Sequence, residues 1–113
     1  MADDLSDQLQ RAAVLAELRR PDDVVRLLTP LLASHPDDPR VLDQLVQAHH
    51  AAGRFEAARD LAHRLVLAEP DAAANHVLLS YAAGACGATD LAVDAASGAA
   101  RLAPGDPYAV YAL

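Results

Sequence analysis

The sequence predicts an all-α fold in which one helical hairpin is repeated along the chain. First, residues 39–70 read as two amphipathic helices that fold back on each other at Gly53 and end at Pro70. Second, the same plan returns 34 residues later, where Gly53 and Pro70 recur as Gly87 and Pro104. A fixed period of this length is typical of stacked supersecondary units and not of a single globular core.

Composition agrees with a helical chain and limits its partners. At 113 residues the chain is one domain long, and its many alanines and scarce aromatics favour helix. The formal net charge of −7 argues against nucleic acid as a partner, because phosphates need Lys or Arg to displace their counterions. All nine cations are Arg, which together with the alanine and aspartate content indicates a GC-rich bacterial source.

Targeting signals and disulfides are not expected. Cys86 is the single cysteine and cannot form an internal disulfide. The acidic N-terminus lacks the apolar core of a signal peptide, and no apolar run is long enough to span a bilayer. These features predict a cytoplasmic protein without a membrane segment.

The first repeat is predicted at residues 5–38, after a frayed start at residues 1–4. Its first helix ends near Arg19, where the later repeats have Gly. Pro21 suits the first turn of the second helix, because that position needs no backbone N–H. Pro30 falls inside the second helix and is expected to kink it, at a cost of roughly 3 kcal/mol, while the apolar face continues beyond. The first repeat is therefore the degenerate one.

The second repeat is predicted at residues 39–72 and is the best-formed unit. Asp38 is an N-cap acceptor, and Pro39 follows it at the first helical position. The two helices are expected at about residues 40–52 and 55–68, with a left-handed turn between them. This repeat is expected to contribute most of the core.

The third repeat is predicted at residues 73–106 and keeps the plan with less apolar bulk. Thr89 is expected to cap its second helix, and Gly98 in the middle of that helix costs about 1 kcal/mol relative to Ala. Residues 107–113 read as the start of a truncated fourth repeat or capping helix, since Pro107 again follows an Asp. We expect this unfinished end to continue into a longer array, or to be covered by a partner or a second copy.

The second repeat contains two bulky residues, an alanine, a turn glycine, an aromatic, an acid with an alanine, and a closing proline: Leu42, Leu45, Ala48, Gly53, Phe55, Glu56, Ala58 and Pro70. These residues give the chain its resemblance to the tetratricopeptide repeat family. It implies a right-handed superhelical array of antiparallel helix–turn–helix repeats, an α-solenoid, with about three repeats and the start of a further helix. In such arrays the first helix of each repeat lines the concave side.

In family members the ligand-facing residues come from these first helices. Carried over to this chain, the resemblance implies a partner-binding set on the concave face: Arg40, Asp43, Gln47, His50, Val77, Tyr81, Tyr108 and Tyr111. A clamp for a partner's C-terminal carboxylates is not expected. The places of its polar and cationic residues hold Leu9, Ala13, Gln44, Ala74 and Leu78 here.

No metal site is predicted from the five histidines. His49 and His50 are adjacent and therefore point to different sides of one helix, and no histidine or acid completes a ligand spacing with them. We expect His49 to be a partly buried structural residue. His50 is expected on the concave surface, either as a contact sensitive to pH near neutrality or as an ordinary solvated side chain.

No catalytic set or cofactor is predicted. Cys86 lies among small apolar residues, which is typical of buried packing and not of a reactive thiol. The paired acids Asp22-Asp23 and Asp37-Asp38 stand at helix starts, where they complement the helix dipole. No glycine-rich phosphate loop is present.

The function predicted from the sequence is that of a non-catalytic scaffold that binds a peptide segment or a helix of a protein partner in its concave groove. The alternative is an oligomerisation or structural module of a longer protein, with the C-terminal helix as the surface for self-association or interdomain contact.

Overall fold

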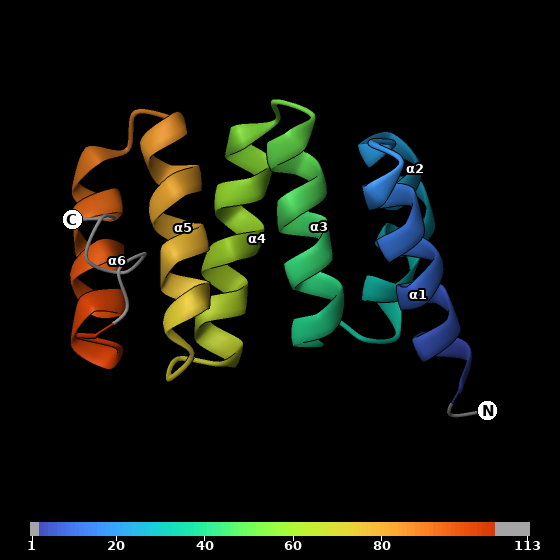
Figure 1. Ribbon diagram of the computed structural model, residues 1–113, viewed down its shortest axis with the longest axis horizontal. Helices are drawn as coiled ribbons and strands as arrows, with labels where there is room; N and C mark the ends of the chain where they lie inside the picture. Colours follow the sequence, from blue (N-terminus) through green and yellow to red (C-terminus); the bar gives the residue numbers. More distant parts are fainter. Residues whose placement is uncertain (1–2, 106–113) are drawn as a thin grey trace.

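A computed structural model describes residues 3–105 and shows a row of antiparallel helices without strands in this part of the chain. The helices are α1 (Asp3–Glu17), α2 (Pro21–Leu28), α3 (Pro39–Ala51), α4 (Phe55–Ala68), α5 (Ala73–Ala85) and α6 (Thr89–Leu102), with a short 3-10 helix, η1 (Thr29–Ala33), after α2. Each helix packs on the next one along the chain, and the pairs α1–α2, α3–α4 and α5–α6 stand side by side (Figure 1). The predicted all-α solenoid is confirmed.

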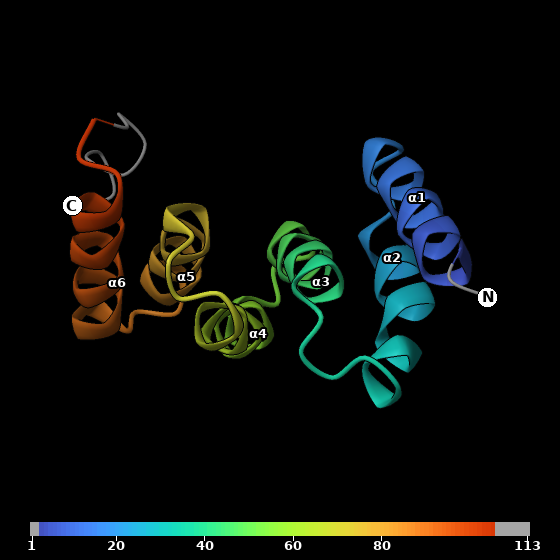
Figure 2. The same cartoon turned by 90° about the horizontal axis from the view of Figure 1, so that it is seen from below.

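Viewed end-on, α1, α3 and α5 lie toward one side of the row and α2 and α4 toward the other (Figure 2). We call the side formed by α1, α3 and α5 the first-helix face. None of the described helices is both long and apolar enough to cross a bilayer. The residue bounds predicted for the three repeats stay predictions.

Three turns reverse the chain with the same geometry. Gly53 and Gly87 both have φ of 79°, and Arg19 has φ of 58° at the equivalent place in the first hairpin. At the turn after α3, the N–H of Gly53 donates to the carbonyl of His50 (3.0 Å) and the N–H of Arg54 to that of His49 (2.9 Å). Equivalent pairs of hydrogen bonds close the turns at residues 19–20 and 87–88. These are Schellman motifs, which satisfy carbonyl groups that a helix end leaves without partners.

The start of α3 follows the sequence prediction. Asp38 is the N-cap residue, its Oδ1 accepts a hydrogen bond from the backbone N–H of Arg40 (3.0 Å), and Pro39 is the first helical residue. Helices α3 and α4 begin and end within one residue of their expected positions. At the N-terminus, α1 begins at Asp3, inside the stretch expected to be frayed.

Two expectations for helix ends were wrong. Pro30 does not kink a continuing α-helix: α2 ends at Leu28, and Pro30 lies in the first turn of η1. Its missing N–H and bulky ring are tolerated there, because a helix start needs no donor at that place. Thr89 is not the cap of α6 either. Ala88 holds the N-cap position without a side-chain hydrogen bond, and Thr89 is the first helical residue.

The apolar core consists of two clusters that meet at α3. The first lies between α1, α2 and α3, and the second between α3, α4, α5 and α6. Leu45 of α3 belongs to the first and Val46 to the second, and both are about 1% exposed. Toward the C-terminus the buried side chains shrink to alanine, as at Ala95, Ala96 and Ala99. The second repeat therefore links the core, and the third packs with little apolar bulk.

Gly98 has a packing reason that the sequence did not show. A Cβ at this position would lie 2.9 Å from Nδ1 of His76 on α5. Nε2 of His76 donates to the carbonyl of Pro70 (2.7 Å), which fixes the ring where it touches α6. The missing side chain of Gly98 thus lets α5 and α6 approach around a hydrogen-bonded histidine.

The three turns predict opposite effects of two substitutions. Arg19→Gly should raise the free energy of unfolding by up to about 1 kcal/mol, because it removes the strain of a side chain in left-handed geometry. Gly53→Val should lower it by about 2 kcal/mol or more, because a β-branched residue fits that geometry badly. Urea denaturation followed by circular dichroism measures both. A destabilised Arg19→Gly protein would contradict the strain argument.

The two helical glycines form a second matched pair. Gly84 lies in α5 with open space around a Cβ, whereas Gly98 faces His76. Gly84→Ala should stabilise the protein by about 0.5–1 kcal/mol through helix propensity, and Gly98→Ala should destabilise it despite the same gain. The melting temperatures of the two variants test this. Equal shifts in the same direction would show that the contact with His76 carries no cost.

Candidate functional site

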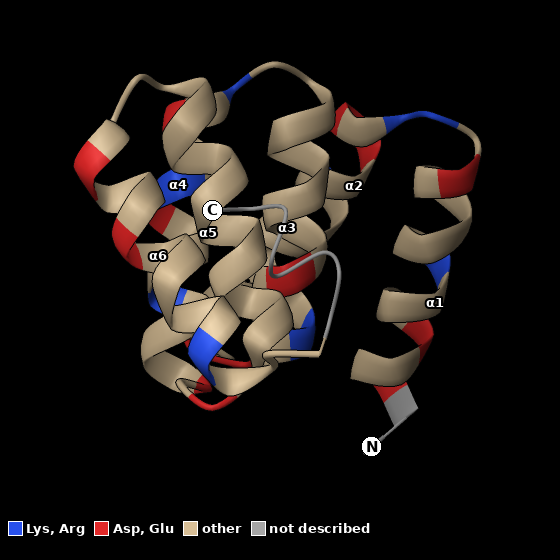
Figure 3. Ribbon diagram, turned by 60° about the vertical axis from the view of Figure 1, so that its left-hand side comes forward, with Lys and Arg blue, Asp and Glu red and all other residues tan. Residues whose placement is uncertain are grey.

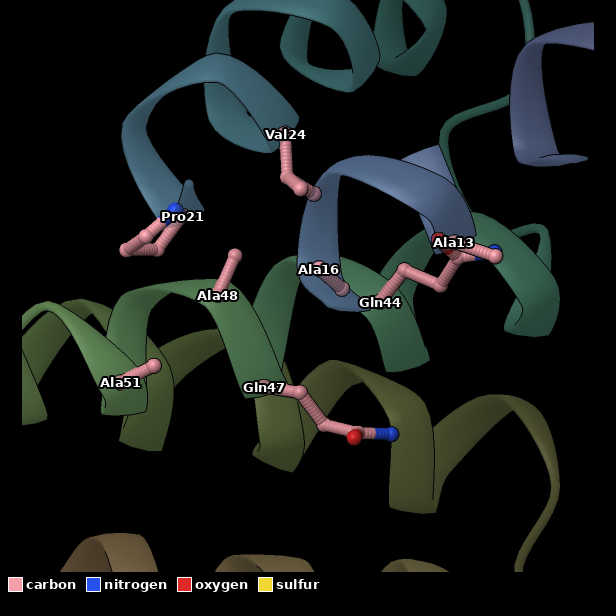
Figure 4. A pocket seen from close by; sticks show the side chains of 8 residues that line it. All are labelled: Ala13, Ala16, Pro21, Val24, Gln44, Gln47, Ala48 and Ala51. Atoms are coloured by element: carbon pink, nitrogen blue, oxygen red, sulfur yellow. The ribbon is translucent and has the colours of Figure 1, made fainter. Parts of the chain in front are cut away.

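The first-helix face contains two neighbouring hollows. The first hollow has a volume of about 350 Å³ and lies between α1, α2 and α3 (Figure 4), lined by Ala13, Ala16, Pro21, Val24, Gln44, Gln47, Ala48 and Ala51. The second hollow has a volume of about 260 Å³ and lies between α3 and α5, lined by Val46, Gln47, His50, Ala51, Leu78 and Tyr81. Gln47 and Ala51 line both, so one ridge of α3 separates them.

The partner residues predicted from the sequence fall into separate groups. Gln47, His50 and Tyr81 meet in the second hollow. Arg40 and Asp43 line a different depression, near the start of α3, together with Glu69, which follows α4, and residues of α5. The geometry thus brings three of the predicted residues together in one hollow, while Arg40 and Asp43 line another depression and Asp43 accepts a hydrogen bond from Gln47.

The remaining members of the predicted set do not line a hollow or cannot be placed. Val77 of α5 is half-buried and lines neither hollow. Tyr108 and Tyr111 lie outside the described residues, as does the predicted fourth helix at residues 107–113. The alternative role of that segment in self-association therefore stays a prediction.

The first hollow was missed by reasoning from the sequence. Its floor is formed by Val24 and Ala48, which are 1% and 6% exposed. Its walls are short because Ala13 and Ala16 on α1 face Ala48 and Ala51 on α3, and alanine leaves space that a larger residue would fill. In the sequence these alanines match core packing between helices equally well. An excess of alanine on both facing helices was the only available signal.

The linings of the two hollows contain no Lys, Arg, Asp or Glu. The lining of the first hollow has no ionisable side chain, and His50 and Tyr81 are the only titratable residues of the second. Helix α5 carries no Lys, Arg, Asp or Glu along its length (Figure 3). Tyr81 is 47% exposed, which is large for an aromatic side chain beside an apolar hollow. The arrangement suits apolar and hydrogen-bond contacts better than ion pairing.

Two polar side chains around the hollows make hydrogen bonds within the chain. Nε2 of Gln44 donates to the carbonyl of Leu9 (3.2 Å), which ties α3 to α1 across the first hollow. Nε2 of Gln47 donates to Oδ1 of Asp43 (3.2 Å), and among residues 3–105 the amide oxygen of Gln47 has no hydrogen-bond donor, so it can accept a hydrogen bond from a ligand. The α3 wall of the hollows is therefore held in place by these hydrogen bonds, and it still offers the amide oxygen of Gln47 as an acceptor.

Arg40 is occupied by its neighbour Asp38. The guanidinium donates to both carboxylate oxygens, from Nε (3.1 Å) and from Nη2 (2.9 Å). These hydrogen bonds lower the pKa of Asp38, although desolvation opposes the shift. Arg40 is therefore a weaker candidate contact than its exposure suggests, because a partner has to compete with this pair.

A polar chain joins the first two repeats beside the first hollow. Nη1 of Arg54 lies 2.8 Å from Oδ1 of Asp22 on α2, and Nε of Arg54 donates to Nδ1 of His49 on α3 (2.9 Å). His49 is half-buried, as expected for a structural histidine. Burial lowers the pKa of His49, the Arg54 cation lowers it further, and Asp22 opposes the shift. Because Nδ1 accepts from Arg54, a proton on that atom would break the contact.

Within residues 3–105, no group of three or more histidines, cysteines and acids lies close enough to hold a metal ion. Cys86 is partly buried, and its thiol donates to the carbonyl of Ala82 (3.1 Å) at the end of α5.

Comparisons with known proteins agree with this architecture. A family model described as the tetratricopeptide repeat matches residues 9–79. The crystal structure of MamA superposes with a TM-score of 0.89 at 17% identity, over 98% of this chain and 65% of MamA. The crystal structure of PcrH in complex with the chaperone binding region of PopD superposes with a TM-score of 0.88 at 18% identity, over 99% of this chain and 87% of PcrH. Among curated proteins, no sequence is significantly similar to this chain.

The state of His49 predicts how stability depends on pH. Because the folded pKa lies below the ordinary value of 6.5, the unfolded chain takes up a proton at this residue before the folded protein does. The free energy of unfolding should therefore be unaffected by His49 above about pH 6.5 and fall as the pH decreases from there toward 5. Asp38 affects the free energy of unfolding only near and below its ordinary pKa of 3.8, which lies outside this pH range.

Urea denaturation at pH 7, 6 and 5 tests this expectation on wild type, His49→Gln and His63→Gln. In the His49→Gln protein the new amide oxygen can still accept from Arg54 but does not titrate in this range. His49→Gln should lose less stability than wild type between pH 7 and 5. His63→Gln, at an exposed position on α4, should follow the wild type. Parallel curves for all three proteins would exclude His49 as the source.

Proposed function

The chain belongs to the tetratricopeptide repeat family, and on this premise we propose that it is a non-catalytic scaffold that binds a segment of a protein partner on its first-helix face. Repeats of this family are typically non-catalytic interaction modules. We further propose that the partner segment lies on this one face and occupies its two hollows.

One observation carries the proposal: the two hollows adjoin across the ridge of Gln47 and Ala51. A segment crossing this ridge can place one side chain in each hollow, because neighbouring helices pack about 8–10 Å apart and an extended chain rises about 3.3 Å per residue. The backbone of the segment then passes over Gln47, whose amide oxygen is free to accept a hydrogen bond. Such a contact combines apolar side chains in the two hollows with a hydrogen bond to Gln47 that fixes the position of the segment.

Tyr81 is the residue that we expect to contribute most to affinity in the second hollow. Its ring is about half exposed without a partner and lies beside Leu78 and His50. A tyrosine in such a place buries a large rigid area on binding and keeps its hydroxyl available. PcrH, which shares this fold at 18% identity, is in complex with a region of another protein, PopD, and this supports the binding of a protein partner in general.

The expected effect of Tyr81→Ala is a loss of about tenfold or more in affinity for a bound segment, with little change in melting temperature. Arg40→Ala should weaken binding less, by about two- to fivefold, because its guanidinium is held by Asp38. Leu67→Ala is the matched control, since Leu67 is 69% exposed on α4, which does not belong to this face.

Phage display of random 12-residue peptides on the immobilised chain supplies the ligands. Calorimetric titration of the enriched peptides into the four proteins gives the affinities, and ¹⁵N–¹H NMR spectra of the wild type locate the bound peptide. Peptides that perturb α2 and α4 and bind Tyr81→Ala as tightly as wild type would refute the proposal.

A further inference from the structure

Helix α1 stands at one end of the row, where it packs on α2 and α3 only (Figure 2). We call its opposite side the outer face of α1, a stripe at helical spacing that consists of Asp7, Gln10, Arg11, Val14, Glu17 and Leu18. All six side chains are exposed, including 55% of Val14 and 61% of Leu18. Five of them line a depression of about 830 Å³, which continues to Leu15 and to Leu27 of α2.

The outer face of α1 corresponds to the surface by which a later repeat contacts the repeat before it. The step of 34 residues that relates the turns also relates two sets of residues, Asp7, Arg11 and Val14 in α1 and Val41, Leu45 and Ala48 in α3. The α3 set is buried in the first core cluster, which lies between α3 and the first repeat. In α1 this helix-packing position carries charged residues in place of two of the apolar ones. Such a composition suits a contact that forms reversibly between separate molecules.

The charges along the outer face follow an order that a second copy can match. Asp7 is negative and Arg11 positive, Val14 is neutral, Glu17 is negative, and Arg19 in the following turn is positive. Acidic and basic bands accordingly alternate along α1 in Figure 3. Read from the other end, the same order has the opposite sign at every charged place. Two α1 helices that run antiparallel about Val14 therefore bring opposite charges together, whereas parallel helices would bring like charges together.

The helical rise gives the levels at which these residues meet. Arg11 and Glu17 each lie three residues from Val14, about 4.5 Å along the axis, so Arg11 of one copy is level with Glu17 of the other. Leu18 is likewise level with Gln10 of the second copy, at the depression. Neither Arg11 nor Glu17 forms a salt bridge within residues 3–105, so both are available for such a pair.

We propose that the outer face of α1 is a self-association surface, on which a second copy of this chain docks its own α1 antiparallel with the two-fold axis close to Val14. Val14 and Leu18 supply apolar burial, and the two pairs of Arg11 with Glu17 fix the direction and register. Exposed ion pairs add little free energy, and two chains of net charge −7 repel each other. The dimer is therefore weak, with a Kd on the order of 10–100 µM. This inference does not depend on the proposed binding of a partner segment.

Analytical ultracentrifugation of charge-swapped proteins, at about 5 to 300 µM in 150 mM NaCl, provides the direct test. Arg11→Glu and Glu17→Arg each place like charges together and should each raise the Kd of the homodimer at least tenfold. A mixture of these two proteins restores both pairs and should form a heterodimer about as tight as the wild-type dimer. Arg101→Glu changes the net charge as Arg11→Glu does, at an exposed position on α6, and should leave the Kd within about twofold.

A cysteine at the two-fold axis tests the register independently of charge. In a Cys86→Ser background, where the serine hydroxyl can keep the bond to Ala82, Val14→Cys should form a disulfide-linked dimer under mild oxidation. Leu67→Cys in the same background is the control, because Leu67 is 69% exposed on α4. This protein should stay largely monomeric in the same time.

The proposal is overturned if the wild type is a monomer at 300 µM. It is also overturned by a dimer that both charge variants leave unchanged, because such a dimer uses another surface. Equal cross-linking of Val14→Cys and Leu67→Cys would exclude the two-fold axis at Val14. A heterodimer that forms only in the mixture of Arg11→Glu and Glu17→Arg, together with selective cross-linking at Val14→Cys, supports it.

Discussion

The left-handed residue at the end of each first helix is the constraint on which the structure depends. Three such residues occur at the same step along the chain, Arg19, Gly53 and Gly87, and each closes its helix with the same two backbone hydrogen bonds. This turn sets where the second helix of the hairpin begins and at what angle it leaves. Because the geometry is the same three times, α1, α3 and α5 come to lie on one side. The first-helix face is a consequence of this repetition.

The two hollows arise from unequal packing along that face. Helix α3 supplies large side chains to both core clusters, Leu45 to one and Val46 to the other, while Ala48 and Ala51, which line the first hollow, are small. Contacts between the first two repeats therefore include polar ones at either end of the first hollow, from Gln44 to Leu9 and from Arg54 to Asp22. Polar contacts fix the spacing of the helices without filling the space between them.

Much of the fold was predictable because glycine and proline affect the backbone at their own positions in the sequence. The positions of Gly53 and Gly87 indicated the hairpins, and Asp38-Pro39 indicated the start of α3. The errors have local causes too: at Thr89 the helix starts one residue earlier than its best capping side chain would suggest. The site was less predictable. Gln47, His50 and Tyr81 do meet, but the first hollow depends on the absence of side chains, and alanine in a sequence does not tell a cavity from a close helix contact.

Stability and binding are connected through the interface between the first two repeats. Its charged contact, from Arg54 to Asp22, is largely exposed on both partners and stabilises the protein little. Apolar burial in the first core cluster has to hold the two repeats together, and two of its members, Val24 and Ala48, also form the floor of the first hollow. An apolar side chain bound there would add packing on both repeats where the chain itself leaves space. A ligand that contacts both repeats binds only when they are docked, so it must also stabilise the fold.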